Sequence, residues 1–203
     1  MTLRPLAAAL ALALAAASVT APAPGRAADA TGAYGARGAQ GVMTCAQLQR
    51  VVAARGPELL ALIAWIDGAV TGANMMLPNT FDLSPYRGSP VVQAMVIKRC
   101  GANPQSPVHA VLYQVLNTLA PFRSQTDGPM VAMSANGSNM AIAESAMRQV
   151  QQQLIERGFL PTRRVDGRYT EPVRKALREF QQANRLPLTE LPDPETLERL
   201  GRR

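Results

Sequence analysis

The sequence predicts an all-α protein, in which an exported, disulfide-tied small helical domain precedes a carboxy-terminal three-helix bundle. Three observations lead to this fold class. Apolar residues recur at the spacing of helices through residues 43–123 and 144–203. Capping residues or proline precede these apolar segments, and glycine or proline follows them. Two cysteines, Cys45 and Cys100, stand far apart in the chain, as a cross-link between helices would require.

The first segment, residues 1–30, predicts a signal peptide. Arg4 supplies a positive charge, and residues 6–19 form an uncharged apolar run. That run is shorter than the roughly 20 residues that a membrane span needs, but it suits a secretory signal. Ala28-Asp29-Ala30 offers a cleavage site, and cleavage a few residues earlier stays open. We expect a periplasmic protein whose mature chain has no membrane span; an uncleaved anchor is the alternative.

Residues 31–42 are rich in Gly and Ala and predict a flexible lead-in. Four short helices are then expected within residues 43–123, each opened by a capping residue or by proline. Thr44 and Gln47 form a capping box at the first of them. The helices are expected from Thr44 to Gly56, from about Glu58 to Ala73, from Ser89 to Cys100 and from Ser106 to the residue before Pro121.

Cys45 and Cys100 predict a disulfide, because two cysteines in an exported chain usually pair. The closed loop would contribute on the order of 4 kcal/mol in the chain-entropy model. The competing reading makes Cys100 a nucleophile activated by His109, the single histidine of the chain. Export and the even cysteine count favour the disulfide, and no HExxH or CxxC pattern indicates zinc. The sequence therefore predicts a non-enzyme with no catalytic residue, metal or cofactor.

Residues 124–143 interrupt the helical pattern with Gly, Ser, Asn and Pro, and they predict a linker. The second domain follows at residues 144–203. Its first helix carries an apolar stripe, and Thr170 and Asp193 are the expected N-caps of its second and third helices. Three short helices can bury only a small core, so this domain should be compact.

An ordered set of residues in this second domain resembles the peptidoglycan-binding domain that recurs in bacterial cell-wall hydrolases. The set comprises Val150, Gln152, Leu154, Gly158, Phe159, Val165-Asp166-Gly167, Tyr169, Arg174, Ala176-Leu177, Phe180-Gln181, Asn184, Leu186-Pro187, Thr189, Asp193, Thr196-Leu197 and Leu200. The resemblance implies a three-helix fold and peptidoglycan as the ligand. The family usually has glycine where this chain has Thr170, Arg185 and Glu190, which predicts altered turns. These departures leave open a fold that no longer binds sugar and contacts protein instead.

The resemblance implies six candidate ligand-binding residues: Asp166, Gly167, Arg168, Tyr169, Arg174 and Gln181. Structural readings compete with this one, since Asp-Gly can simply make a turn and Tyr169 and Phe180 can belong to the core. Five arginines could contact wall carboxylates or phosphates, or could form a solvated face: Arg163, Arg164, Arg168, Arg174 and Arg178.

Residues 43–123 carry a second resemblance, to the periplasmic acid-stress chaperones of the HdeA type. The motifs are Met43-Thr44-Cys45, Trp65-Ile66-Asp67-Gly68, Val91-Val92 leading to Cys100, and Asn103-Pro104. Immunity proteins against cell-wall amidase toxins share the helix-glycine segment and the valine-rich helix, so two families stay open. An acid switch needs several carboxylates that titrate, and this domain has only Glu58, Asp67 and Asp82.

The formal net charge of +7 suits a polyanionic partner. Nucleic-acid binding would favour interleaved aromatic residues, and these make up only 4% of the chain. We therefore expect peptidoglycan as the partner, with a periplasmic protein as a second partner and no nucleic acid. The expected function is non-catalytic peptidoglycan binding, with residues 43–123 as a protein-binding or chaperone-like module. The alternative is an interaction or immunity protein that acts on a cell-wall enzyme.

Overall fold

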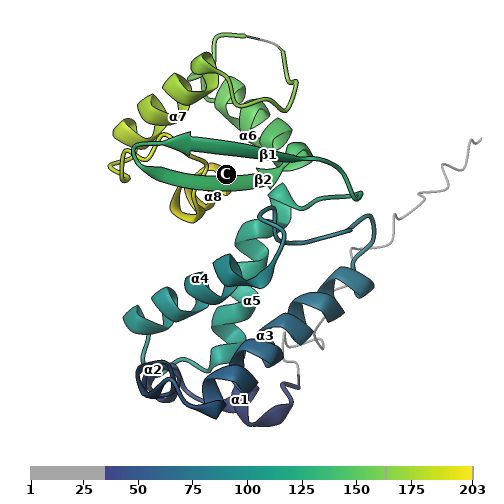
Figure 1. Ribbon diagram of the computed structural model, residues 1–203, viewed down its shortest axis with the longest axis vertical. Coiled ribbons are helices and arrows are strands. Elements are labelled where there is room, and N and C mark those ends of the chain that lie inside the picture. Colours follow the sequence, from purple (N-terminus) through teal and green to yellow (C-terminus); the bar gives the residue numbers. More distant parts are fainter. Residues whose placement is uncertain (1–34, 163, 203) are drawn as a thin grey trace, which may run out of the picture. The chain divides into compact units, whose positions relative to one another are not determined.

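The computed structural model describes residues 35–162 and 164–202, so the predicted signal peptide and Arg163 lie outside the described residues (Figure 1). Helices form most of the regular structure in these ranges. In order, the elements are α1 (Gly38–Val42), α2 (Cys45–Ala54), α3 (Pro57–Met76), α4 (Ser89–Ala102), α5 (Val108–Leu119), the 3₁₀ helix η1 (Ala120–Phe122), β1 (Met130–Ala135), β2 (Ser138–Ala143), α6 (Glu144–Glu156), α7 (Glu171–Ala183) and α8 (Pro194–Gly201).

Helix α2 begins at the predicted capping box. The Gln47 amide donates to Thr44 Oγ1 at 3.3 Å, and the Thr44 amide donates to Gln47 Oε1 at 2.7 Å. Two free backbone amides at the start of the helix are thereby satisfied. The helix ends at Arg55, whose φ of 52° lies in the left-handed region. Gly56 and Pro57 then open α3, so the predicted boundary between the two helices is confirmed.

Two helix starts differ from the predicted ones. Gly88 rather than Ser89 occupies the N-cap of α4, and α4 continues past Cys100 to Ala102. Pro107 occupies the N-cap of α5, where the sequence favoured a Ser-Pro opening. In both cases proline is tolerated near the helix start because the amide it lacks has no partner there.

The lead-in contains a short helix that the sequence did not predict. Residues 38–42 form α1, which packs against α3 and α5. Gly41 lies so close to the indole that a Cβ there would come within 2.7 Å of Trp65 Cζ2. Trp65 Nε1 donates to the carbonyl oxygen of Arg37 at 3.0 Å. This aromatic side chain therefore fixes the segment that precedes the disulfide.

Helix α3 leaves the expected absence of a membrane span in the mature chain a prediction. The sequence predicted a helix of residues 58–73, whereas α3 covers twenty residues, Pro57–Met76, with a mean hydropathy of 1.5 in its most apolar window. Among the described residues, it is the one helix that is long and apolar enough to cross a bilayer. Core helices of soluble proteins can have the same length and hydropathy. Only 17% of the most apolar stretch of α3 is buried within the protein.

Cys45 and Cys100 form the predicted disulfide, which joins the first residue of α2 to α4. Both cysteines are fully buried, and α4 packs against both α2 and α5. The apolar stripe of α5 faces this core, as its spacing predicted. Its buried members are Val108, Val111, Leu112, Val115 and Leu119.

The all-α prediction is wrong for residues 130–143, which lie in the predicted linker. They form an antiparallel hairpin in which Met130 pairs with Ala143 and Ala135 pairs with Ser138. Asn136 and Gly137 make the turn with φ values of 50° and 75°. Asn-Gly between alternating apolar residues favours this type of two-residue turn, because both residues tolerate positive φ. The hairpin packs against α6 (Figure 1).

The three helices predicted for the carboxy-terminal domain are present as α6, α7 and α8. Asp193 caps α8 as predicted, since its carboxylate accepts from the Thr196 amide at 2.8 Å. Thr170 occupies the N-cap position of α7, but its side chain makes no capping hydrogen bond. Gly158 follows α6 with a φ of 78°, the left-handed conformation that a glycine adopts without strain.

One hydrophobic cluster contains buried residues of both predicted domains. Helix α5 packs against α8, and η1 packs against α6. Polar contacts add to this packing: Tyr86 Oη donates to the Pro192 carbonyl oxygen at 2.9 Å, and Arg99 pairs with Glu198 at 2.7 Å. The division of the chain at residues 124–143 stays a prediction.

Candidate functional site

A buried glutamine on α6 holds the Asp-Gly turn that the sequence singled out. Gln151 Nε2 donates to Asp166 Oδ1 at 2.9 Å and to the Arg168 carbonyl oxygen at 3.1 Å. Gln151 Oε1 accepts from the Gly167 amide at 2.8 Å. Asp166 Oδ1 also accepts from the Arg168 amide at 3.0 Å. The turn is therefore held by hydrogen bonds on both sides, and the Arg168 side chain is exposed beside it.

Gly167 is required at this turn for two reasons. Its φ is 76°, and a Cβ would come within 2.5 Å of Glu144 Cγ and 3.1 Å of the Glu144 carbonyl oxygen.

The carboxylate of Asp166 accepts hydrogen bonds from the Gln151 side chain and from the Arg168 amide, which lower the pKa of Asp166. The turn thus keeps a carboxylate ionised at the surface.

A second buried glutamine, on α7, holds the loop before α8 in the same way. Gln181 Nε2 donates to the Leu191 carbonyl oxygen and to Thr196 Oγ1, each at 2.9 Å, and it also reaches Thr189 Oγ1. Gln181 Oε1 accepts from the Glu190 amide at 2.9 Å. The side chain has no exposed surface. Gln181 can therefore act on a ligand only by positioning the loop of residues 189–191.

Arg174 and Glu190 form part of the wall of a polar cavity of about 340 Å³ along α7, and Tyr169 contacts Glu190 without lining the cavity itself. Arg174 Nε and Nη2 donate to the two carboxylate oxygens of Glu171 at 2.9 and 3.0 Å. Its remaining nitrogen, Nη1, lies 3.2 Å from Glu190 Oε2. The hydrogen bonds from Arg174 lower the pKa of Glu171, and the same pairing raises the pKa of Arg174. Burial raises the pKa of Tyr169, whose hydroxyl donates to the Glu190 carbonyl oxygen at 3.0 Å.

Two of the three positions at which the resembled family usually has glycine keep a left-handed backbone. Arg185 has a φ of 55° and Glu190 a φ of 61°, whereas Thr170 has an ordinary φ of −108°. A side chain in the left-handed region costs roughly 1–2 kcal/mol relative to the usual conformation. The turns are therefore retained at Arg185 and Glu190 with strain, and no glycine is needed at Thr170.

The six candidate residues thus fall in three places. Asp166, Gly167 and Arg168 form the clamped turn, Arg174 lines the polar cavity while Tyr169 contacts the backbone of Glu190 beside it, and Gln181 lies in the interior. The clamping role of Gln151 was missed. Its signal in the sequence was a polar residue at a helical position three residues before Leu154 and four after Met147, both of which are buried.

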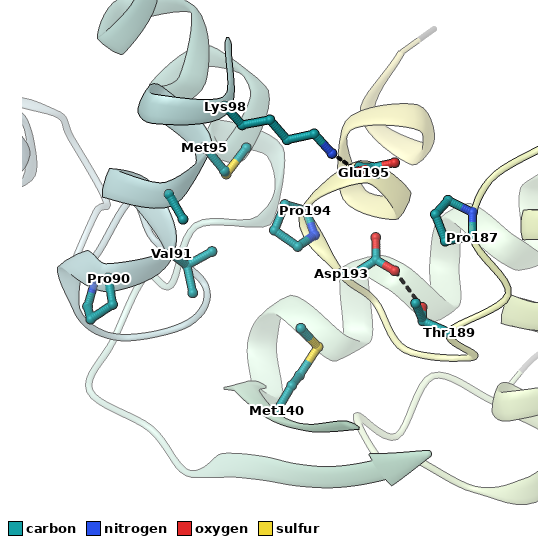
Figure 2. A pocket seen from close by; sticks show the side chains of 11 residues that line it. Pro90, Val91, Met95, Lys98, Met140, Pro187, Thr189, Asp193, Pro194 and Glu195 are labelled. Carbon is teal, nitrogen blue, oxygen red and sulfur yellow. Dashed lines mark hydrogen bonds and ion pairs between the residues drawn. The ribbon is translucent and has the colours of Figure 1, made fainter. Parts of the chain in front are cut away.

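A larger and mostly apolar cavity, of about 500 Å³, lies where α4, β2 and the loop before α8 meet (Figure 2). Lys98 pairs with Glu195 at its rim, and Asp193 accepts a hydrogen bond from Thr189 Oγ1 on its other side. None of the six candidate ligand-binding residues lines it. Its walls are formed by Pro90, Val91, Ala94, Met95, Lys98, Met140, Pro187, Thr189, Asp193, Pro194 and Glu195.

Comparison with known proteins supports the assignment of the carboxy-terminal part. Residues 143–200 match the model of a family described as "Putative peptidoglycan binding domain". The chain matches no curated protein and no solved structure. The resemblance predicted for residues 150–200 is therefore confirmed, and the resemblance of residues 43–123 to HdeA-type chaperones stays a prediction.

Proposed function

We propose that this protein is an exported, non-catalytic peptidoglycan-binding protein that acts at the cell wall. The match of residues 143–200 to a peptidoglycan-binding family carries the proposal. The disulfide between Cys45 and Cys100 fits a cell-wall or extracellular location, where oxidising conditions preserve such bonds. Both cysteines are committed to the disulfide, which argues against a thiol nucleophile at Cys100.

The wall contact is proposed at the turn of residues 166–168 and at the neighbouring cavity near Tyr169 and Arg174. The turn is rigid because Gln151 holds it, and it presents the exposed guanidinium group of Arg168. A positioned guanidinium suits the carboxylates of peptide stems, with which it can form charge-assisted hydrogen bonds. Gln181 belongs to this site as a positioning residue, since its side chain is enclosed.

Residues 43–123 are proposed to bind a protein at the wall. Helix α3 supports this role because large apolar side chains at both of its ends are exposed: Leu60 by 70%, Met75 by 80% and Met76 by 83%. Neighbouring exposed apolar groups such as Met75 and Met76 are typical of interaction surfaces. A chaperone-like module and a regulator or immunity protein for a wall enzyme both fit such a surface. The small number of carboxylates in this part of the chain counts against an acid-triggered switch.

Co-sedimentation of the exported protein with purified peptidoglycan sacculi tests the proposal. The protein should sediment saturably, and binding should survive physiological salt. Arg168→Ala should weaken binding about tenfold or more, since a hydrogen bond to a charged group contributes roughly 1.5–3 kcal/mol. Arg50→Ala is the matched control, because Arg50 is an equally charged, exposed side chain on α2. It should stay within about twofold of the unaltered protein, as expected for a distant surface charge.

Two outcomes would count against the proposal. If the folded protein stays in the supernatant, the carboxy-terminal fold does not bind the wall, and a protein-interaction role becomes the better candidate. If Arg168→Ala and Arg50→Ala weaken binding equally, attachment depends on overall charge and the proposed site is wrong.

A further inference from the structure

Glu190 occupies an unusual place in the polar cavity along α7. Its backbone is left-handed, with a φ of 61°, and only 7% of the residue is exposed. The Glu190 amide donates to Gln181 Oε1, and its carbonyl oxygen accepts from Tyr169 Oη. Both backbone polar groups of Glu190 are thus hydrogen-bonded without any contribution from its carboxylate. This fixed backbone sets the direction in which the side chain points.

The carboxylate of Glu190 lies between two guanidinium groups. Oε2 is 3.2 Å from Arg174 Nη1, and Oε1 is 3.5 Å from Arg178 Nη1. The other two nitrogens of the Arg174 guanidinium donate hydrogen bonds to Glu171. Every nitrogen of the Arg174 guanidinium therefore already faces a carboxylate of the chain itself.

The charges that line the cavity are balanced. Three acidic residues and three basic residues line it with one glutamine: Glu171, Glu179, Glu190, Arg174, Lys175, Arg178 and Gln182. A free carboxylate that entered this cavity would find Arg174 saturated and would meet the negative charge of Glu190. Because the Glu190 side chain is only 10% exposed, solvent screens that repulsion weakly. An uncharged amide or hydroxyl group would meet no such penalty.

We propose that Glu190 is an internal counter-ion that sets the ligand class of this cavity. The cavity takes uncharged amide- and hydroxyl-bearing groups of the glycopeptide and discriminates against free carboxylates. This inference rests on the proposed function and adds to it the chemistry of the bound group. In this arrangement Arg168 lies outside the polar cavity and contacts anionic groups of the wall. The polar cavity along α7 contacts neutral groups.

The test compares Glu190→Gln with the unaltered protein and with Glu156→Gln. Glutamine has the shape of glutamate, and residue 190 keeps its backbone hydrogen bonds. Glu156→Gln changes the net charge by the same amount on α6, where the carboxylate accepts hydrogen bonds only from Gln152 and Gln153 among its described contacts. A circular dichroism spectrum of each protein verifies folding.

Each protein is sedimented with untreated sacculi and with sacculi whose free carboxylates have been converted to primary amides. The ratio of the two affinities is the readout, and the contribution of Arg168 cancels because all three proteins retain it. Glu190→Gln should raise the preference for carboxylate-bearing sacculi about threefold, in line with the loss of one opposing charge. Glu156→Gln should keep the original ratio. An unchanged ratio in Glu190→Gln would overturn the inference and leave wall binding intact.

A second readout needs no wall. The Nε–Hε resonance of Arg174 is followed by NMR while inorganic phosphate is added. A saturable shift in Glu190→Gln alone supports the inference, and equal shifts in all three proteins refute it. If none of the proteins sediments with either preparation of sacculi, the proposed function fails, and this titration still decides whether Glu190 blocks the arginines.

Discussion

Single residues decide the shape of the candidate site. Gln151 and Gln181 play the same structural role, and each lies buried on a helix. Each accepts a hydrogen bond from the backbone amide of a residue with positive φ, Gly167 in one turn and Glu190 in the other. A buried carboxamide without partners would be costly, so each glutamine and its turn stabilise one another. At the second turn the chain has Glu190 where the resembled family usually has glycine, so a carboxylate lines the polar cavity along α7.

Arg185 allows a direct test of backbone strain at this scale. Its side chain is exposed and its φ is 55°. Arg185→Gly should raise the free energy of unfolding by about 0.5–1 kcal/mol, because the left-handed conformation is unstrained for glycine and the gain exceeds the added freedom of the unfolded chain. Urea unfolding followed by circular dichroism measures this. Arg185→Ala is the control, and a glycine variant no more stable than the alanine variant would contradict the prediction.

At the scale of elements, local signals at the helix ends control where each helix begins. The clearest case is α2, which starts at the capping box of Thr44 and Gln47 and carries the disulfide in its first turn. The end of α3 shows the opposite situation. Few signals stop this helix before Met76, and it therefore runs beyond the range expected from its apolar spacing.

Thr44→Ala tests how much the capping box contributes. The variant should lose about 1 kcal/mol of unfolding free energy, because the Gln47 amide loses its acceptor at the helix start. Thr44→Ser retains the hydroxyl and should stay close to the unaltered protein in the same urea experiment. Equal losses in both variants would assign the effect to the methyl group of threonine and not to the cap.

At the scale of the whole molecule, residues distant in the sequence share one core. Tyr86, in the loop after α3, donates to the Pro192 carbonyl oxygen at the start of the α8 region, and Phe122 and Leu200 are buried in the same cluster. The apolar cavity in Figure 2 is lined by residues of both predicted domains and of the hairpin. Any ligand of that cavity would therefore contact parts of the chain that the family match does not cover.

Tyr86 also makes the free energy of unfolding depend on pH in the alkaline range. Burial, and to a smaller extent the nearby Asp193 carboxylate, raise the pKa of Tyr86 well above its usual value. The unfolded chain then loses the proton at a lower pH than the folded protein does. The stability contributed by Tyr86 is thus complete below about pH 10 and is lost as the pH rises above it.

Tyr86→Phe should therefore be less stable than the unaltered protein by about 1 kcal/mol at neutral pH, where a buried hydrogen bond is lost. The difference should shrink as the pH rises past about 10, because only the tyrosine protein is penalised by ionisation of the unfolded chain. Urea unfolding at several pH values measures both effects. Tyr113→Phe, at a residue 52% exposed, is the control for removing a tyrosine hydroxyl at the surface. A pH-independent difference for Tyr86→Phe would contradict the assignment.

The sequence by itself determined what local chemistry controls. Helical spacing, the capping box at Thr44 and the cap at Asp193 were readable because each depends on residues within one or two turns. The pairing of Cys45 with Cys100 was predicted from the expected export and the even cysteine count. The turn at Asp166 was readable from its Asp-Gly pair, and the ordered residues between positions 150 and 200 pointed to the family that the comparison confirms.

Only the tertiary structure decided which of these side chains are available. Gln181 matched the family motif, yet its enclosure depends on how the loop before α8 folds over α7. The carboxylate of Glu190 meets Arg174 and Arg178 because the backbone there is left-handed, and no local pattern specifies that direction. The hairpin of residues 130–143 had a local turn signal, but strands need partners and a surface to pack on, which here is α6. Contacts between distant residues thus determined the site, because burial and charge pairing depend on the whole fold.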